Sequence, residues 1–205
     1  MKVRVMQVRV MQVRVILAAL VAAPVALAQP ASAQNTTGTV KLTGSVAPRC
    51  GVAGSGSGSI FGQTVALGEL AAADGTLRTG IESQFANAVA AVSVVCNTVA
   101  PTISVSATAL SAQTSTSAPP AGYANSIAYT ATVSLGTTGS VPVLLSAVSG
   151  TGASHALSSG EGRIANSAGN LVLSATAFHT ATPAQIQVAD NSYRGSIAIT
   201  IAPGA

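Results

Sequence analysis

Strict alternation of apolar and small polar residues constrains the fold of this chain more than any other feature. Between Ile127 and Val133 every second residue is Ile, Tyr, Ala or Val, and between Ile197 and Ile201 isoleucine takes every second position. Successive side chains of a strand point to opposite faces of a sheet, so this period is typical of strands with one buried face. Long patterns with a helical period are missing after residue 33. The sequence therefore predicts an all-β fold.

Clusters of Gly, Ser, Pro and Asn separate the apolar runs and predict turns between short strands. The run 89–96 is almost continuously apolar, which is expected of a strand buried on both faces. Pro142 has to lie at the start or the edge of its strand, because it cannot donate a backbone hydrogen bond. About eight short strands favour a β-sandwich over a barrel. The strand candidates are 40–50, 89–96, 103–109, 127–133, 141–147, 171–178, 185–189 and 197–201.

Residues 1–33 have the organisation of a secretory signal peptide. Four basic residues precede an uncharged apolar run, 15–28, which is shorter than the roughly 20 residues of a membrane-spanning helix. Small-residue cleavage sites end at Ala28 and Ala33; we expect cleavage after Ala33, with Ala28 as the alternative. Met1, Met6 and Met11 could each begin the chain. The sequence thus predicts an exported protein.

Removal of this segment changes the charge balance. Five cations and five carboxylates remain, so the pI of 9.6 mostly reflects the signal peptide. Nucleic-acid binding needs clustered cations, which the exported part lacks, and we exclude that class. Charged residues make up only 7% of the chain, which predicts a protein that works packed against a partner.

Two cysteines, Cys50 and Cys96, follow the signal peptide. In an oxidising compartment two thiols in one small domain most simply form a disulfide. Closure of this loop should stabilise the fold by about 4 kcal/mol in the chain-entropy model. Reactive or metal-binding thiols are the alternative, but there is no CxxC motif and no nearby histidine.

A search for catalytic groups finds no candidate active site. His155 and His179 stand in turn-rich stretches without metal-ligand spacing, and no carboxylates are paired. Gly54–Ser59 lacks the lysine of a phosphate-binding loop and is expected to be a flexible turn. We therefore expect no enzyme activity, no metal and no cofactor, and the scarcity of aromatic residues argues against a dedicated lectin.

Three segments, in this order, resemble the spore coat protein U domain family, which includes the subunits of archaic chaperone–usher pili. Thr36–Cys50 resembles the family's alternating N-terminal extension that ends at a cysteine. Val92–Asn97 is similar to the strand before the partner cysteine. Asn191–Ile201 is similar to the closing Ser-Tyr turn and apolar strand.

This resemblance implies an incomplete immunoglobulin-like β-sandwich, 48–205, that is completed by a donor strand from another copy. The extension 34–47 would supply that strand, with Val40, Leu42 and Val46 as groove-filling side chains and Lys41 and Thr43 on the opposite face. Only four residues follow Ile201, so we expect no further strand there. The edge of the acceptor groove would be formed by Ile197, Ile199 and Ile201.

The function expected from the resemblance is that of a structural pilus (fimbrium) subunit assembled by chaperone–usher donor-strand exchange. Its partners would be copies of itself or related subunits, a periplasmic chaperone and an outer-membrane usher. Export through the periplasm would bring it to the cell surface, where pili serve adhesion. The alternative is a self-contained exported sandwich that acts as a surface-coat or binding module, with 40–46 as an ordinary first strand.

Overall fold

The computed structural model describes residues 41–52 and 62–204. The chain divides into two units, Met1–Gly44 and Ser45–Ala205, and the secondary structure of the described residues lies in the second unit. The expected signal peptide, Val40 and the turn Gly54–Ser59 lie outside the described residues.

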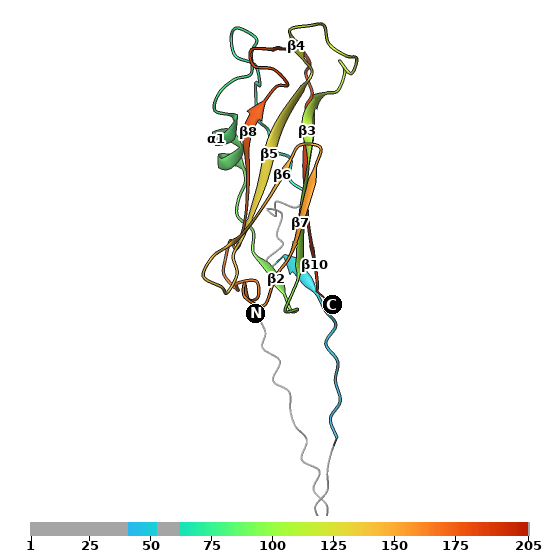
Figure 1. Ribbon diagram of the computed structural model, residues 1–205, viewed down its shortest axis with the longest axis vertical. Coiled ribbons are helices and arrows are strands. Elements are labelled where there is room, and N and C mark those ends of the chain that lie inside the picture. Colours follow the sequence, from blue (N-terminus) through green and yellow to red (C-terminus); the bar gives the residue numbers. More distant parts are fainter. Residues whose placement is uncertain (1–40, 53–61, 205) are drawn as a thin grey trace, which may run out of the picture. The chain divides into compact units, whose positions relative to one another are not determined.

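The second unit has an all-β, sandwich-like fold with one short helix, which confirms the predicted class (Figure 1). The elements are β1 (Cys50–Val52), α1 (Ile81–Ala88), β2 (Val94–Cys96), β3 (Thr102–Ala112), β4 (Tyr123–Ala124), β5 (Ser126–Leu135), β6 (Val143–Val148), β7 (Gly152–Ala156), β8 (Leu171–His179), β9 (Ile186–Gln187) and β10 (Tyr193–Ala202).

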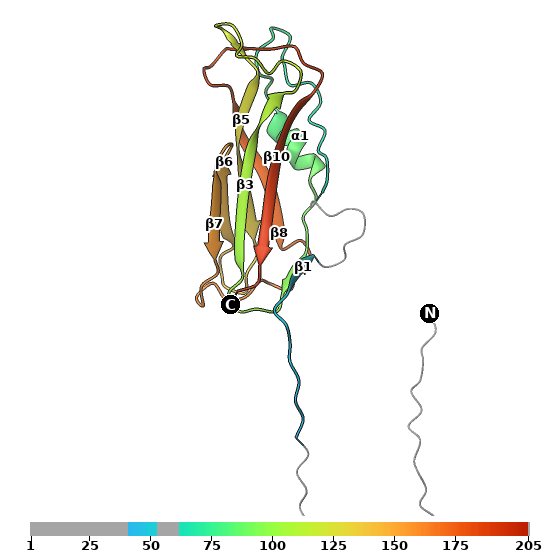
Figure 2. The same cartoon turned by 90° about the vertical axis from the view of Figure 1, so that its right-hand side faces the viewer.

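Two long strands, β3 and β5, organise the pairing. β3 pairs with β10 along one edge and with β7 along the other, while β5 lies between β6 and β8. β3 and β5 pair with each other only at Leu110–Ile127 and Ser111–Ser126, so the sheet turns there into two layers (Figure 2). All of these pairs are antiparallel. Two small sheets, β1–β2 and the parallel pair β4–β9, lie outside these layers.

The core lies between the two layers and is built from the alternating residues that the sequence indicated. Odd-numbered residues of β5 and β6, and of β3 as far as Ala107, point inward, and their even-numbered neighbours are mostly Ser, Thr or Ala. The most completely buried side chains include Ile103, Val105, Ile127, Val133, Leu135 and Leu171. The alternation predicted over 127–133 is therefore confirmed.

Two strand predictions near the N-terminus need correction. No strand is found over Lys41–Arg49, and the first strand begins at Cys50. The run 89–96 is a strand only from Val94, and its residues are not buried on both faces. Val92 and Val94 face the core, whereas Val95 is 45% exposed. The run lies at the border of the sandwich, where only one face is covered.

The helix α1 was not predicted. Ile81 and Phe85, four residues apart, are its buried side chains, and Val89 N–H donates to Phe85 O where it ends. The helix packs against β8, whose face it covers. Eight residues are too few for a detectable helical period, because tertiary packing stabilises so short a helix more than propensity does.

The expected placement of the histidines in turns is wrong. His155 lies on β7, a strand that the sequence did not predict, and His179 is the last residue of β8. The candidate 185–189 shrinks to the two residues of β9. The exposure of β7 alternates, but its sequence Gly-Ala-Ser-His-Ala has no large apolar side chain, and β9 is too short to show any period.

Asn170 joins β2 to the start of β8 by acting as a substitute for a paired strand. Its Nδ2 donates to Val94 O and its Oδ1 accepts from Val94 N–H, both at 2.7 Å. Beside it, Val92 and Leu171 exchange backbone hydrogen bonds. Asn170 is 6% exposed, so water cannot easily replace these contacts.

We predict that Asn170→Ala lowers the free energy of unfolding by about 2 to 3 kcal/mol, because both backbone groups of Val94 lose their partner in a buried site. Urea denaturation monitored by circular dichroism measures the change. Asn191→Ala, at an exposed asparagine, is the control and should have little effect. A loss below about 0.5 kcal/mol would mean that the Asn170 contacts do not hold β2 in place.

Candidate functional site

The edge of β10 that faces away from β3 is the main candidate for a functional site, and we call it the open edge. Nine residue pairs join β10 to β3, from Tyr193–Ala112 to Ala202–Thr102. Among the described residues no strand pairs with β10 along its other side. A strand edge of this length presents backbone groups that can pair with another chain.

The isoleucines of β10 are incompletely covered. They pair with residues of β3 that point into the core, so they lie on the core side of the sheet. Their β3 partners are 1–3% exposed, yet the isoleucines remain only partly buried while packing against the core. The pairs are Ile197–Ala107, Ile199–Val105 and Ile201–Ile103. The core is thus closed beneath β3 and incomplete beneath β10.

A hollow of about 640 Å³ lies beside the first half of β10, and we call it the edge hollow. It is lined by Tyr193–Ile197 of β10 and by residues of β3, β5, β8, α1 and the segment 62–67. Most of the side chains that line its interior are apolar: Val65, Leu67, Phe85, Val89, Leu110, Leu173, Phe178 and Ile197. The hollow therefore suits apolar side chains better than a polar small molecule.

Two stacked rings line the edge hollow. Tyr129 of β5 and Phe178 of β8 have ring centroids 5.3 Å apart. A register shift in β8 accompanies this contact, with Ala177 at φ 54° and its N–H donating to Glu82 Oε1 at 2.6 Å. α1 therefore helps to hold Phe178 in the hollow through the Glu82 carboxylate.

The Tyr129 hydroxyl crosses the sandwich and donates to Ser196 O of β10 at 3.0 Å. At this point the β3–β10 register shifts, and Ser196 N–H donates to the Thr108 hydroxyl instead of a carbonyl of β3. Gly195 is required there, since a Cβ would lie 2.8 Å from Thr108 O. Burial raises the pKa of Tyr129 to about 12. Tyr129 thus anchors β10 where its ladder to β3 is broken.

Asp190 fixes the loop that leads into β10. Its carboxylate accepts from the Thr114 hydroxyl at 2.6 Å and from the N–H groups of Thr114, Ser115 and Ser192. These hydrogen bonds, the Thr114 hydroxyl first, hold the pKa of Asp190 well below its usual range. The start of β10 is therefore tied to the end of β3.

The predicted disulfide is confirmed, and it lies at the opposite end of β10 from the edge hollow. Cys50 and Cys96 are bonded and face each other across β1 and β2. Asn97 holds the preceding chain: its Oδ1 accepts from Arg49 N–H and its Nδ2 donates to Ala47 O. Gly204 N–H donates to the Thr98 hydroxyl, so the end of β10 lies here too.

The predicted donor residues lie before this disulfide. Val40 is outside the described residues, Leu42 is 92% exposed and Val46 is 85% exposed. Residues 41–49 form no strand. Two large apolar side chains therefore stand in water, which is costly unless they have a partner elsewhere.

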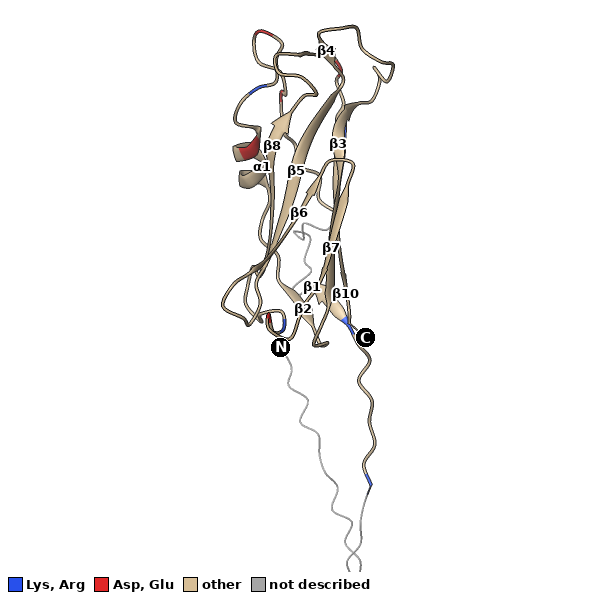
Figure 3. Ribbon diagram, in the orientation of Figure 1, with Lys and Arg blue, Asp and Glu red and all other residues tan. Residues whose placement is uncertain are grey.

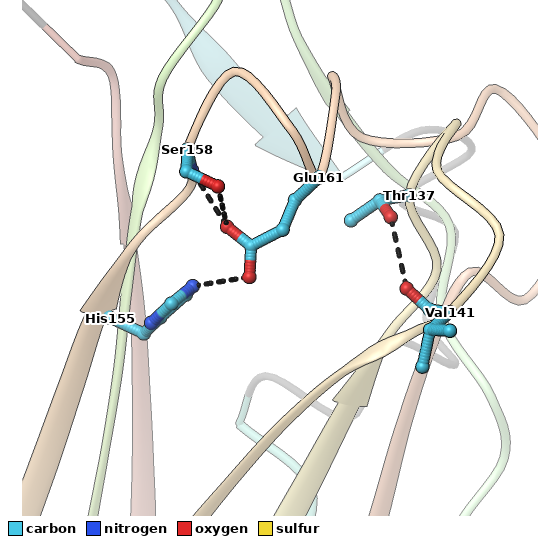
Figure 4. Close-up of polar contacts among 5 residues, drawn as sticks. All are labelled: Thr137, Val141, His155, Ser158 and Glu161. Carbon is cyan, nitrogen blue, oxygen red and sulfur yellow. Dashed lines mark hydrogen bonds and ion pairs between the residues drawn. The ribbon is translucent and has the colours of Figure 1, made fainter.

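One polar cluster, formed by His155, Ser158 and Glu161, was not predicted from the sequence. His155 Nε2 lies 2.8 Å from Glu161 Oε1, and Glu161 Oε2 accepts from Ser158 N–H and from the Ser158 hydroxyl (Figure 4). The bonds from Ser158 hold the pKa of Glu161 below its usual range, with His155 adding a smaller effect. The carboxylate lies between serine and histidine, so the cluster is not a nucleophile–base pair. It ties β7 to the following loop.

Within residues 41–52 and 62–204, no group of three His, Cys, Asp or Glu side chains could hold a metal ion. The same part of the chain contains no helix that is long and apolar enough to cross a membrane. Comparison with family models, curated proteins and solved structures finds no match to this chain.

We predict that Tyr129→Phe lowers the free energy of unfolding by about 1 kcal/mol at neutral pH, because Ser196 O loses a donor. Urea denaturation of Tyr129→Phe against Tyr123→Phe, whose side chain is exposed, tests this. The raised pKa of Tyr129 also stabilises the fold below pH about 10, and that contribution is lost as the pH rises toward 12. Burial also raises the pKa of Tyr193, so absorbance at alkaline pH should show late ionisation of two tyrosines, and Tyr129→Phe should remove one of them; an unchanged amplitude would contradict the assignment.

Proposed function

We propose that this protein is a structural subunit of an extracellular fibre, in which the N-terminal extension of one copy completes the open edge of the next. The observation that carries the proposal is the incomplete cover of β10. Its core-side isoleucines remain partly exposed, whereas the β3 residues paired with them are almost fully buried. A further strand along β10 would cover them and would pair with its free backbone groups.

The extension has the composition that such a strand needs. Val40, Leu42 and Val46 share one parity and would point to the core side, while Lys41 and Thr43 would face outward. Each buried Val or Leu side chain contributes about 1.5 to 3 kcal/mol. The apolar lining of the edge hollow supports the same assignment, because it offers space next to the first isoleucine, Ile197.

The directions of the segments support assembly in one direction. β10 runs from the edge hollow to the disulfide, and residues 45–49 leave the sandwich at the disulfide end (Figures 1 and 2). A donor strand antiparallel to β10 would place its last residues near Tyr193, with the donor's own domain beyond the hollow. Repetition of this head-to-tail contact does not close on itself and generates a filament.

Before assembly, the open edge would require protection. A periplasmic chaperone that adds a temporary strand to β10 would cover the same isoleucines, and an outer-membrane usher would catalyse its replacement at the cell surface. An immunoglobulin-like sandwich that lacks one strand is the architecture that this sequence of events requires.

Purification of the chain from Gln34 to Ala205, with and without residues 34–46, tests the proposal. Size-exclusion chromatography and electron microscopy should detect fibres or stable oligomers of the longer chain only. Added peptide 34–46 should bind the shortened chain and raise its melting temperature. A stable, folded monomer in both cases would instead favour a self-contained surface-coat or binding module.

We predict that Leu42→Asp abolishes fibre formation, because a carboxylate would have to enter an apolar groove at a cost of several kcal/mol. Thr43→Asp is the matched control, with the same charge on the neighbouring residue but on the outward face. It should assemble as the unmodified chain does. Electron microscopy and sedimentation measure both, and equal assembly of the two variants would show that Leu42 is not an anchor.

A further inference from the structure

The charged residues are concentrated at the two ends of the sandwich. Of the ten Lys, Arg, Asp and Glu residues among the described residues, only Arg194 lies on a strand. Figure 3 shows red and blue at the two ends and on α1, while the strands between them are tan. Two surfaces follow, which we call the hollow end, where β10 begins, and the disulfide end, where β10 finishes.

The hollow end carries an excess of negative charge. Glu82 is placed there by its bond to Ala177 near the end of β8, and Asp190 by its bonds to Thr114. Arg78 donates to Leu67 O, beside the edge hollow, and an isolated bridge pairs Thr76 with Ile186 of β9. Four carboxylates therefore stand against two guanidinium groups; the members are Glu69, Asp74, Glu82 and Asp190 against Arg78 and Arg194.

The disulfide end carries the opposite excess. Arg49 lies next to Cys50 and is exposed, and Arg163 is exposed in the loop between β7 and β8. Glu161, in the same loop, lies 2.8 Å from His155 and accepts from Ser158, and its charge offsets one of these two cations. Lys41 lies in the extension, so it carries a further positive charge into the site that the extension occupies. Neither arginine side chain has a described hydrogen-bond partner, so both remain available to a neighbouring molecule.

We propose that the two ends of this protein form a charge-complementary contact, in which the positive disulfide end of one copy docks on the negative hollow end of the next. This inference rests on the proposed fibre assembly and adds an interface to it. The donor strand alone would leave the two domains free to pivot where the strand joins Ala47, the first residue that Asn97 holds. The charged contact would guide each incoming copy to the hollow end, which is the end at which its extension must enter.

The choice of a second copy as the partner follows from the charges and the direction of the chain. The exported part has no net charge, so copies do not repel one another overall, while each carries opposite charge at its two ends. The extension leaves from the positive end. Contact between two like ends would bring like charges together, which selects head-to-tail order over the inverted arrangement.

Charge reversal at exposed residues tests the interface. The hollow-end variant is E69K with D74K, and the disulfide-end variant is R49E with R163E. Each should slow fibre growth about tenfold at about 10 mM salt, where the Debye length is about 30 Å. At about 1 M salt the Debye length falls to about 3 Å, and the growth rates of the variants and of the unmodified chain should converge. The control S106K with T176K adds the same number of lysines to the sheet faces and should leave growth unchanged.

Combination of all four reversals in one chain exchanges the signs of the two ends. Growth at low salt should then recover toward the unmodified rate, which a merely structural effect of the substitutions would not produce. Equal growth of all variants, or no recovery in the combined chain, would overturn the proposal.

Binding of peptide 34–46, measured by calorimetry on the same variants, separates this inference from strand exchange. The peptide lacks the disulfide end, so reversals at that end should leave its affinity unchanged. Peptide binding without charge-dependent growth would retain strand exchange and overturn the charged contact. If neither the peptide binds nor fibres form, both proposals fail.

Discussion

A strand carries backbone hydrogen-bonding groups along two edges, and among the described residues β10 is paired along only one of them, with β3. This unpaired edge explains the contacts that surround β10. Near its start, β10 is protected by a register shift at Gly195 and by the charge of Arg194, two features that discourage unwanted pairing of edges. From Ile197 onward neither protection is present. The free edge of β10 is therefore interrupted near its start and is regular along the rest of its length.

The remaining structure compensates locally for a core that is not closed. Tyr129 reaches from the other layer to Ser196, and Asp190 holds the loop before β10 against the end of β3. At the far end, Asn170 supplies both hydrogen bonds that a neighbouring strand would give to Val94. Side chains thus supply hydrogen bonds that the backbone of a neighbouring strand would otherwise supply. Such contacts keep the isolated domain ordered without occupying the edge itself.

The sequence predicted those parts of the fold in which one physical rule acts alone. β5 and the isoleucines of β10 follow a plain alternation, because each strand has one face toward the core, and the disulfide was expected from two cysteines in a chain with the pattern of an exported protein. Alternation in β3 fails beyond Ala107, since the register shift opposite Gly195 turns Leu110 toward the core instead. α1 and β7 are too short to show a period.

The candidate site could be predicted only in part for a related reason. Ile197, Ile199 and Ile201 were recognisable as one apolar face, but their incomplete cover depends on which strands pair with β10, and sequence alone does not show this. The edge hollow joins residues from α1, β5, β8 and β10 that are far apart in the chain. The contact of His155 with Glu161 depends on β7, which the alternation had not revealed.

The position of the disulfide has a mechanical consequence. Residues 47–49 are tied to Asn97, and the next residue, Cys50, is bonded to Cys96, which lies a few residues before β3. A pull on the extension therefore passes through the sulfur atoms and reaches the longest strand of the sandwich directly. The disulfide bypasses the covalent segment between the two cysteines, which includes α1. In the proposed fibre, tension would therefore reach β3 of each copy first and would leave that copy through the groove that holds the extension of its neighbour.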